Sequence, residues 1–129
     1  GVESFKIENN KTKKIICNEN PNNYKILVSR SHLDDKTRKI IKSFEKENIL
    51  ERGSSLKFCL IAEGIADIYF RFGNTMEWDI AAGHAILKNA NGRVADEEYI
   101  EIKYGKRNFK NNSFIAYSKA SEEKLKSFL

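Results

Sequence analysis

Short apolar runs alternate with helix-like segments over most of this chain, and this alternation most limits the folds open to it. Residues 24–29 form a nearly continuous apolar run, which is typical of a central strand, and residues 66–72 alternate between apolar and polar side chains. Segments 35–47, 55–63 and 78–89 carry apolar side chains at helical spacing. Strands that alternate with helices indicate a layered α/β domain.

The two ends of the chain have simpler patterns. Segments 5–8 and 12–17 predict two short strands, and Asn9 and Asn10 between them predict the turn of a hairpin. Segments 49–51, 93–96 and 114–117 predict further strands, and 121–129 predicts a closing helix. Residues 97–113 are charged and contain Gly and Asn, so we expect a loop there, with Glu97 and Glu98 exposed.

Composition predicts one domain that spans residues 1–129. The chain has 129 residues, of which 40% are hydrophobic, and a single proline. Its net charge of +5 comes from lysines scattered among acids, which indicates a solvated surface that attracts an anionic substrate rather than a nucleic-acid-binding face. Cys17 and Cys59 do not make a disulfide framework, and no leader or membrane-spanning run is visible, so we expect a cytoplasmic protein.

The segment Glu77-Trp78-Asp79-Ile80-Ala81-Ala82-Gly83 is the most informative motif. It places Asp79 at the start of a helix of small residues, where backbone N–H groups point outward and the helix dipole is positive. The simpler interpretation is that Asp79 caps the helix. The alternative is that Asp79 faces a cleft and binds a metal ion.

Two further groups of residues are candidates for binding an anion. Ser54, within Gly53-Ser54-Ser55, precedes a helix whose first turn holds Lys57, and a helix start of this kind attracts phosphate. Arg71 ends the alternating strand, and a guanidinium can bind phosphate through two parallel hydrogen bonds. Each has an ordinary alternative: Ser54 as a helix cap and Arg71 as a surface residue. His32 follows the central strand, where a lone histidine is usually solvated. His84 lies on the polar side of its helix, so we expect it to be a surface residue.

The motif around Asp79, together with residues 53–64, 66–73 and 28–32, resembles the inositol monophosphatase superfamily of magnesium-dependent phosphatases, and its 3'(2'),5'-bisphosphate nucleotidase branch in particular. The resemblance is clearest between residues 26 and 94. It implies the layered α/β/α fold of the C-terminal domain of these enzymes, with a mixed sheet of about five to six strands. It also implies hydrolysis of adenosine 3',5'-bisphosphate to AMP and phosphate.

The resemblance implies a role for each candidate residue. Asp79 would bind a catalytic Mg²⁺ and contact the substrate, whereas Ser54 and Lys57 would contact its phosphate. Arg71 would help to hold the substrate, as an arginine at this position does in bisphosphate nucleotidases, whereas inositol phosphatases have an acid here. His32 would lie against the adenosine.

The sequence also departs from this family. In the family, a glutamate pair and an Asp-Pro-x-Asp-Gly-Thr motif supply the other metal ligands. Neither has a counterpart in this chain. We therefore expect the chain to correspond to the C-terminal half alone, without the N-terminal metal-binding domain, to bind Mg²⁺ weakly or not at all, and to be inactive by itself. The alternatives are a non-catalytic nucleotide or phosphate binder and an inositol-phosphatase-like domain. The contact face of such a half would be exposed, so we expect self-association or a separate N-terminal fragment as partner.

Overall fold

A mixed five-stranded sheet forms the centre of the computed structural model, which describes residues 1–30 and 33–128. The strand order is β4-β3-β5-β9-β7, in which β3 is parallel to β4 and β5 while β9 is antiparallel to β5 and β7. The strands are β3 (Ile26–Ser29), β4 (Ile49–Arg52), β5 (Ile68–Arg71), β7 (Gly92–Ala95) and β9 (Phe114–Ser118). This confirms the predicted mixed sheet of an α/β fold.

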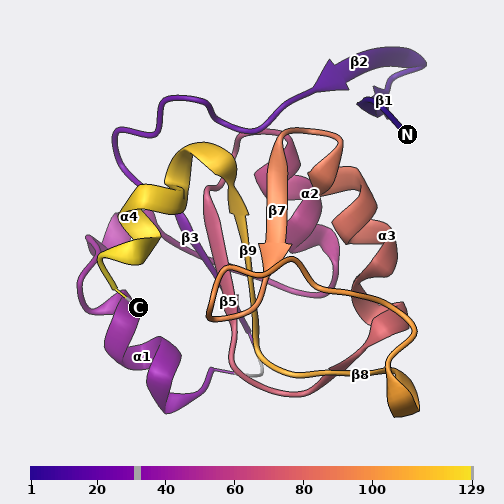
Figure 1. Ribbon diagram of the computed structural model, residues 1–129. Coiled ribbons are helices and arrows are strands. Elements are labelled where there is room, and N and C mark those ends of the chain that lie inside the picture. The colour runs from indigo at the N-terminus through magenta and orange to yellow at the C-terminus, as the bar shows by residue number, and fades with distance from the viewer. Residues whose placement is uncertain (31–32, 129) are drawn as a thin grey trace.

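Helices cover both faces of the sheet and make it the middle of three layers (Figure 1). The pair α2 (Leu56–Ala62) and α3 (Glu77–Lys88) lies on one face. The pair α1 (Asp35–Ile41) and α4 (Glu122–Lys126) lies on the other. Short 3₁₀ turns at Lys46–Asn48, Arg107–Phe109 and Lys119–Ser121 connect these elements.

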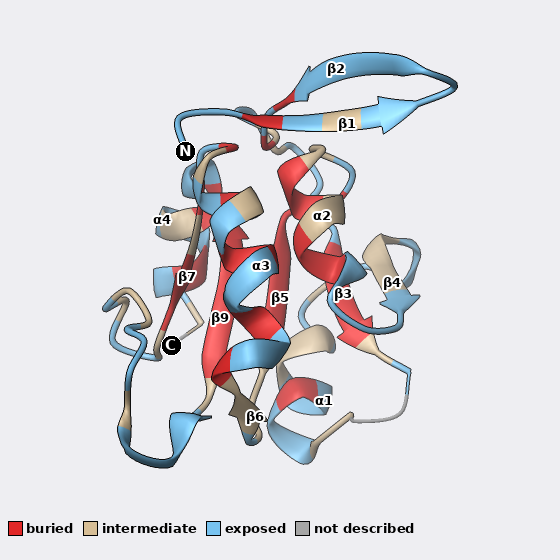
Figure 2. Cartoon of the chain, turned by 90° about the vertical axis from the view of Figure 1, so that its right-hand side faces the viewer, coloured by how far each residue is buried: buried red, intermediate tan, exposed pale blue. Residues whose placement is uncertain are grey.

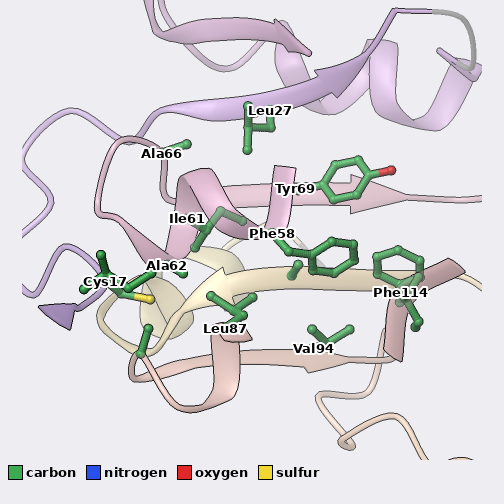
Figure 3. Close-up of a cluster of buried hydrophobic side chains, with 14 residues drawn as sticks. Cys17, Leu27, Phe58, Ile61, Ala62, Ala66, Tyr69, Leu87, Val94 and Phe114 are labelled. Carbon is green, nitrogen blue, oxygen red and sulfur yellow. The ribbon is translucent and has the colours of Figure 1, made fainter. Parts of the chain in front are cut away.

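Side chains that follow one another along a strand point to opposite faces of the sheet, so a strand contributes to two separate hydrophobic cores. On β5, Tyr69 packs with the α2 and α3 layer, whereas Ile68 and Phe70 pack with α1 and α4. Figure 2 shows the resulting buried sheet, and Figure 3 shows the first core, in which Phe58 of α2 lies beside Tyr69 and Phe114. These three rings pack with centroids 5.8–6.0 Å apart. All three residues belong to this core and also line the pocket described below.

The N-terminal hairpin of β1 (Ser4–Glu8) and β2 (Lys11–Ile15) lies beyond one end of the layers (Figure 1) and contacts them, because the hydroxyl of Ser4 donates to the carbonyl oxygen of Ile86 at 2.6 Å. Its turn is at Asn9 and Asn10, as predicted, and both residues have a positive φ that asparagine tolerates better than most residues. None of the helices in the described residues is both long and apolar enough to span a bilayer.

Two expectations from the sequence need correction. The helix predicted over 35–47 ends at Ile41, because Ser43 and Phe44 donate to carbonyls three residues back and the helix tightens into a turn. The loop predicted over 97–113 contains β8 (Lys110–Asn111), which pairs with β6 (Thr75–Met76) just before α3. The loop is therefore bound to the start of the helix that carries Asp79.

Candidate functional site

A pocket of about 500 Å³ opens where the parallel strands end. Ser29 ends β3, Arg71 ends β5, and residues 53–55 follow β4, so the pocket lies at the carboxyl edge of the parallel part of the sheet. This edge is where open α/β sheets usually bind ligands. The lining includes four of the residues singled out from the sequence: Ser54, Lys57, Arg71 and Asp79.

Lys57 is the most unusual of these residues, because its side chain is charged yet the residue is only 3% exposed. Its ammonium donates to the carbonyl oxygen of Arg52 at 3.2 Å and lies 4.8 Å from the ring centre of Tyr69. Burial, and then the charge of Arg71, lowers the pKa of Lys57. A buried lysine that lies beside a second cation costs folding energy, and a bound anion would offset this cost.

Arg71 lines the same pocket at the end of β5. Its Nε atom is buried and has no hydrogen-bond partner among the described residues. Burial raises the pKa of the neighbouring Tyr69, and the positive charge of Arg71 partly opposes this rise. A buried guanidinium N–H without an acceptor among the described residues is free to bind an acceptor that enters the pocket.

Ser54 lies in the turn between β4 and α2 and has a φ of 54°, a left-handed conformation that costs energy for a residue with a side chain. The simpler interpretation of Ser54 as the cap of α2 is wrong, because Ser55 is the N-cap residue and makes no side-chain capping bond. The turn instead presents residues 53–55 to the pocket.

Asp79 is not the N-cap residue of α3, because Met76 holds that position, but its carboxylate still binds the start of the helix, and its metal-binding role stays a prediction. It lies in the first turn of α3, and its Oδ2 accepts a hydrogen bond of 2.8 Å from the backbone N–H of Met76, the N-cap residue. The carboxylate thus stabilises the start of its helix. The residue is nevertheless exposed and lines the pocket, so one carboxylate is present near the two cations.

The carboxylates of this chain do not fit a complete magnesium site. Mg²⁺ binds oxygen ligands in a near-octahedral arrangement and gives up its water reluctantly. In residues 1–30 and 33–128, no group of three or more His, Cys, Asp or Glu side chains is placed to hold a metal ion. Asp79 can supply one ligand at most, and one of its oxygens already accepts the bond from Met76.

Glu77, which the sequence analysis did not single out, holds the loop that borders the site. It is 7% exposed, and its carboxylate accepts from the backbone N–H groups of Gly105 and Lys106 at 3.0 and 2.9 Å. The ammonium of Lys106 lies 2.8 Å from it. The side-chain bond to Lys106 is the main cause that lowers the pKa of Glu77 to about 2. Because its partners lie 28 and 29 residues away in the chain, no local pattern marks this residue.

The expectation that His84 lies on the surface is wrong. His84 is 4% exposed, because the 97–113 loop folds over its helix. Its Nδ1 lies 2.7 Å from the hydroxyl of Tyr104, and its Nε2 lies 3.3 Å from Glu101. Burial lowers the pKa of His84, although Glu101 partly opposes this. His32 lies outside the described residues, while Glu97 and Glu98 are exposed as predicted.

The chain is similar in sequence to several known proteins. The chain is 44% identical over 82 residues to the 3'(2'),5'-bisphosphate nucleotidase CysQ of Salmonella typhimurium, a match that covers 64% of this chain and 33% of the relative. It is 51% identical over 69 residues to the CysQ protein of Buchnera aphidicola, over 54% of this chain and 26% of the relative. The matches therefore span about a third of these relatives or less.

A solved structure supports the same assignment. The crystal structure of CysQ from Bacteroides thetaiotaomicron superposes with a TM-score of 0.73 at 38% identity, over 84% of this chain and 42% of that chain. The profile of the inositol monophosphatase family matches residues 3–127, which is nearly the full length. The chain therefore belongs to the inositol monophosphatase family.

Proposed function

We propose that this chain is the substrate-binding part of a magnesium-dependent 3'(2'),5'-bisphosphate nucleotidase, one that hydrolyses adenosine 3',5'-bisphosphate to AMP and phosphate. The observation that carries the proposal is the pairing of a buried lysine with a buried, unpartnered arginine Nε in one pocket. A phosphate would accept from both, because its oxygens match the planar donors of Arg71 and the point charge of Lys57. In this arrangement Ser54 would donate a further hydrogen bond.

Asp79 gives a reason for a metal ion in the complete site. A carboxylate that lines a phosphate pocket would repel the substrate unless a cation lies between them. Because the described part of this chain does not gather enough oxygen ligands for Mg²⁺, we propose that an N-terminal domain supplies the others and that the chain alone is inactive. The free Cys17 and Cys59 fit the reducing cytoplasm, where we place the protein.

Binding can be tested without any metal. We expect calorimetry in EDTA to detect adenosine 3',5'-bisphosphate binding to the chain, and Arg71→Gln to weaken it by about tenfold or more, which is the effect of losing one charge-assisted contact. Lys13→Gln, which removes one exposed charge from the hairpin, is the matched control and should bind like the wild type. An Arg71→Gln variant that binds as tightly as the control would contradict the proposed site.

Turnover provides the second test. The chain should not hydrolyse the bisphosphate with Mg²⁺ alone, and it should gain activity when it is mixed with the N-terminal part of a CysQ protein. Robust turnover by the chain alone, abolished by Asp79→Ala, would refute the need for another domain.

The incomplete donor set also favours a second candidate, a non-catalytic nucleotide binder. Binding in EDTA without any gain of activity on mixing would support that function instead.

A further inference from the structure

An exposed pair of aromatic side chains adjoins the pocket that Lys57 and Arg71 line. Trp78, the only tryptophan of the sequence, is 67% exposed and lines that pocket as well. Phe109 is 54% exposed and lies beside Trp78, with 6.3 Å between the ring centroids and 47° between the ring planes. The two rings form an open aromatic surface that continues from the pocket, and a ligand that covers it would remove apolar area from water.

The fold brings these two rings together from distant parts of the sequence. Trp78 follows β6 and Phe109 precedes β8, and the pairing of these strands aligns Met76 with Lys110 beside the start of α3 (Figure 1). Phe109 has a φ of 54°, a left-handed conformation that is unfavourable for a bulky side chain. Backbone strain of this kind persists only where the surrounding structure holds it, and it is common at ligand-binding sites. The rings are therefore in position before a ligand arrives.

The same strand pairing orients a hydroxyl group of the pocket. Thr75 lines the pocket, and its Oγ1 accepts a hydrogen bond of 3.2 Å from the side-chain amide of Asn111, which is fully buried. Because the oxygen accepts this bond, the hydroxyl hydrogen of Thr75 can still donate to a ligand. The site thus offers two cations, a hydroxyl donor and an aromatic surface. A nucleotide carries three matching groups: an anionic phosphate, a hydroxylated ribose and a flat base.

A flat base fits the aromatic surface better than a polyol does. Aromatic rings attract one another through stacked and edge-to-face contacts, and every nucleobase has a face that can stack. A polyol carries hydroxyl groups that lose hydrogen bonds to water when they are pressed against apolar rings. The indole N–H of Trp78 is the one polar group that the two rings could offer them in return.

We propose that Trp78 and Phe109 stack against the base of the nucleotide whose phosphate Lys57 and Arg71 bind. The contact rests on the proposed function above and identifies the residues that select a nucleotide over a sugar phosphate. Trp78 is then a specificity-determining residue, because stacking adds affinity for a phosphate ester that carries a base and none for a phosphate without one.

The fluorescence of Trp78 tests the contact in the unaltered chain. Because the sequence has no second tryptophan, the indole emission reports on this position alone. In EDTA, adenosine 3',5'-bisphosphate should quench the emission over the same concentrations at which calorimetry detects its binding, because the base stacks on the indole. Inorganic phosphate and ribose 5-phosphate should bind without comparable quenching.

Substitution of the rings provides the second measurement. Trp78→Leu should weaken the binding of adenosine 3',5'-bisphosphate by about tenfold, which is the effect of losing one stack between a base and an aromatic ring, and should change the affinity for inorganic phosphate much less. Phe109→Leu should act in the same direction with a smaller effect, because Phe109 lies outside the pocket lining. Phe5→Leu is the matched control and should bind like the wild type, because Phe5 lies on the hairpin and is 53% exposed.

Failure of the base contact and failure of the phosphate site give different results. A chain that binds neither inorganic phosphate nor the nucleotide would overturn both proposals. A chain that binds phosphate, together with a Trp78→Leu variant that binds the nucleotide as tightly as the wild type, would overturn the base contact alone. If the emission responds to the N-terminal part of a CysQ protein and not to the nucleotide, the two rings form a contact between domains, and the base contact is wrong.

Discussion

The pocket at the carboxyl edge of the sheet and the contact between α3 and its neighbouring loop use the same kinds of charged group in opposite ways. In the loop contact, both carboxylate oxygens of Glu77 have partners from the same chain: two backbone N–H groups and the Lys106 ammonium. In the pocket, Lys57 and Arg71 lie close enough for the charge of Arg71 to lower the pKa of Lys57, and no described carboxylate pairs with either. A buried charge that is satisfied internally stabilises the fold, whereas one left without a counter-charge is available to a ligand.

The first prediction breaks the satisfied contact and should have the largest effect on stability. Glu77→Gln keeps the size of the side chain but removes its charge and turns an amide N–H₂ toward backbone donors. Lys106 then loses its counter-charge, and at least one backbone N–H loses its acceptor. We expect the midpoint of urea unfolding to fall further than for any other variant proposed here. Glu19→Gln, an exposed control, should unfold like the wild type.

The pH dependence of Glu77 provides an independent check. Its pKa in the folded protein is about 2, below the ordinary value of 4.5, so the folded state favours the ionised carboxylate. This contribution to stability is complete above about pH 4.5 and is lost as the pH falls toward 2. Acid should therefore destabilise the wild type more steeply than Glu77→Gln in this range. Equal slopes would show that Glu77 is not held as described.

The second prediction concerns Lys57, which has no counter-charge among the described residues. Replacing it should raise the free energy of unfolding, whereas replacing Glu77 should lower it. Lys57→Met fills a similar volume without a charge, so it removes the desolvation cost and the repulsion by Arg71. It also loses the bond to the Arg52 carbonyl oxygen and the contact with the Tyr69 ring, which are weaker. We expect the free energy of unfolding to rise by about 1 kcal/mol while the affinity for inorganic phosphate falls at least about tenfold.

Lys13→Met is the matched control, because Lys13 is exposed on the hairpin. It should change neither stability nor phosphate affinity appreciably. Urea unfolding measures the free energy of unfolding, and calorimetry on the same preparations measures the affinity for phosphate. If Lys57→Met were less stable than the wild type and still bound phosphate, Lys57 would be a structural residue like Glu77.

These two regions also differ in how far the sequence predicts them. Ser54, Lys57, Arg71 and Asp79 each follow a strand or open a helix, and parallel strands bring their carboxyl ends to one edge, so local patterns together with topology place them in one pocket. The layered sheet follows from the same alternation of elements.

The loop contact could not be predicted in this way. Glu77 and His84 both depend on residues 101–106, whose path over α3 results from tertiary packing and from the pairing of β6 with β8. In the sequence, His84 occupies a polar position on an amphipathic helix, and only the folded loop makes that position buried. Long-range contacts of this kind leave no periodic signal in the residues that form them.

The last prediction concerns His84, which is intermediate between the two extremes because it is buried but has partners on both ring nitrogens. The groups that face it are Lys88, Glu101 and Tyr104, and burial outweighs Glu101 in lowering the pKa of His84 below 6.5. The unfolded chain therefore binds a proton at a higher pH than the folded protein does. Stability contributed by the neutral ring is complete above about pH 6.5 and declines as the pH falls toward the lower folded value.

Between pH 7 and pH 5, we therefore expect the free energy of unfolding to fall by at most about 1.4 kcal/mol per pH unit through this residue, the limit for one proton. His84→Gln should remove this part of the slope. Tyr104→Phe keeps the histidine, and because the pKa of Tyr104 is raised to about 12 the hydroxyl does not titrate in this range, so the slope should remain. A His84→Gln variant with the slope of the wild type would assign the pH dependence to another group. The loop contact would then be insensitive to protonation of His84, and the acidic groups Glu77 and Glu101 would connect it to pH.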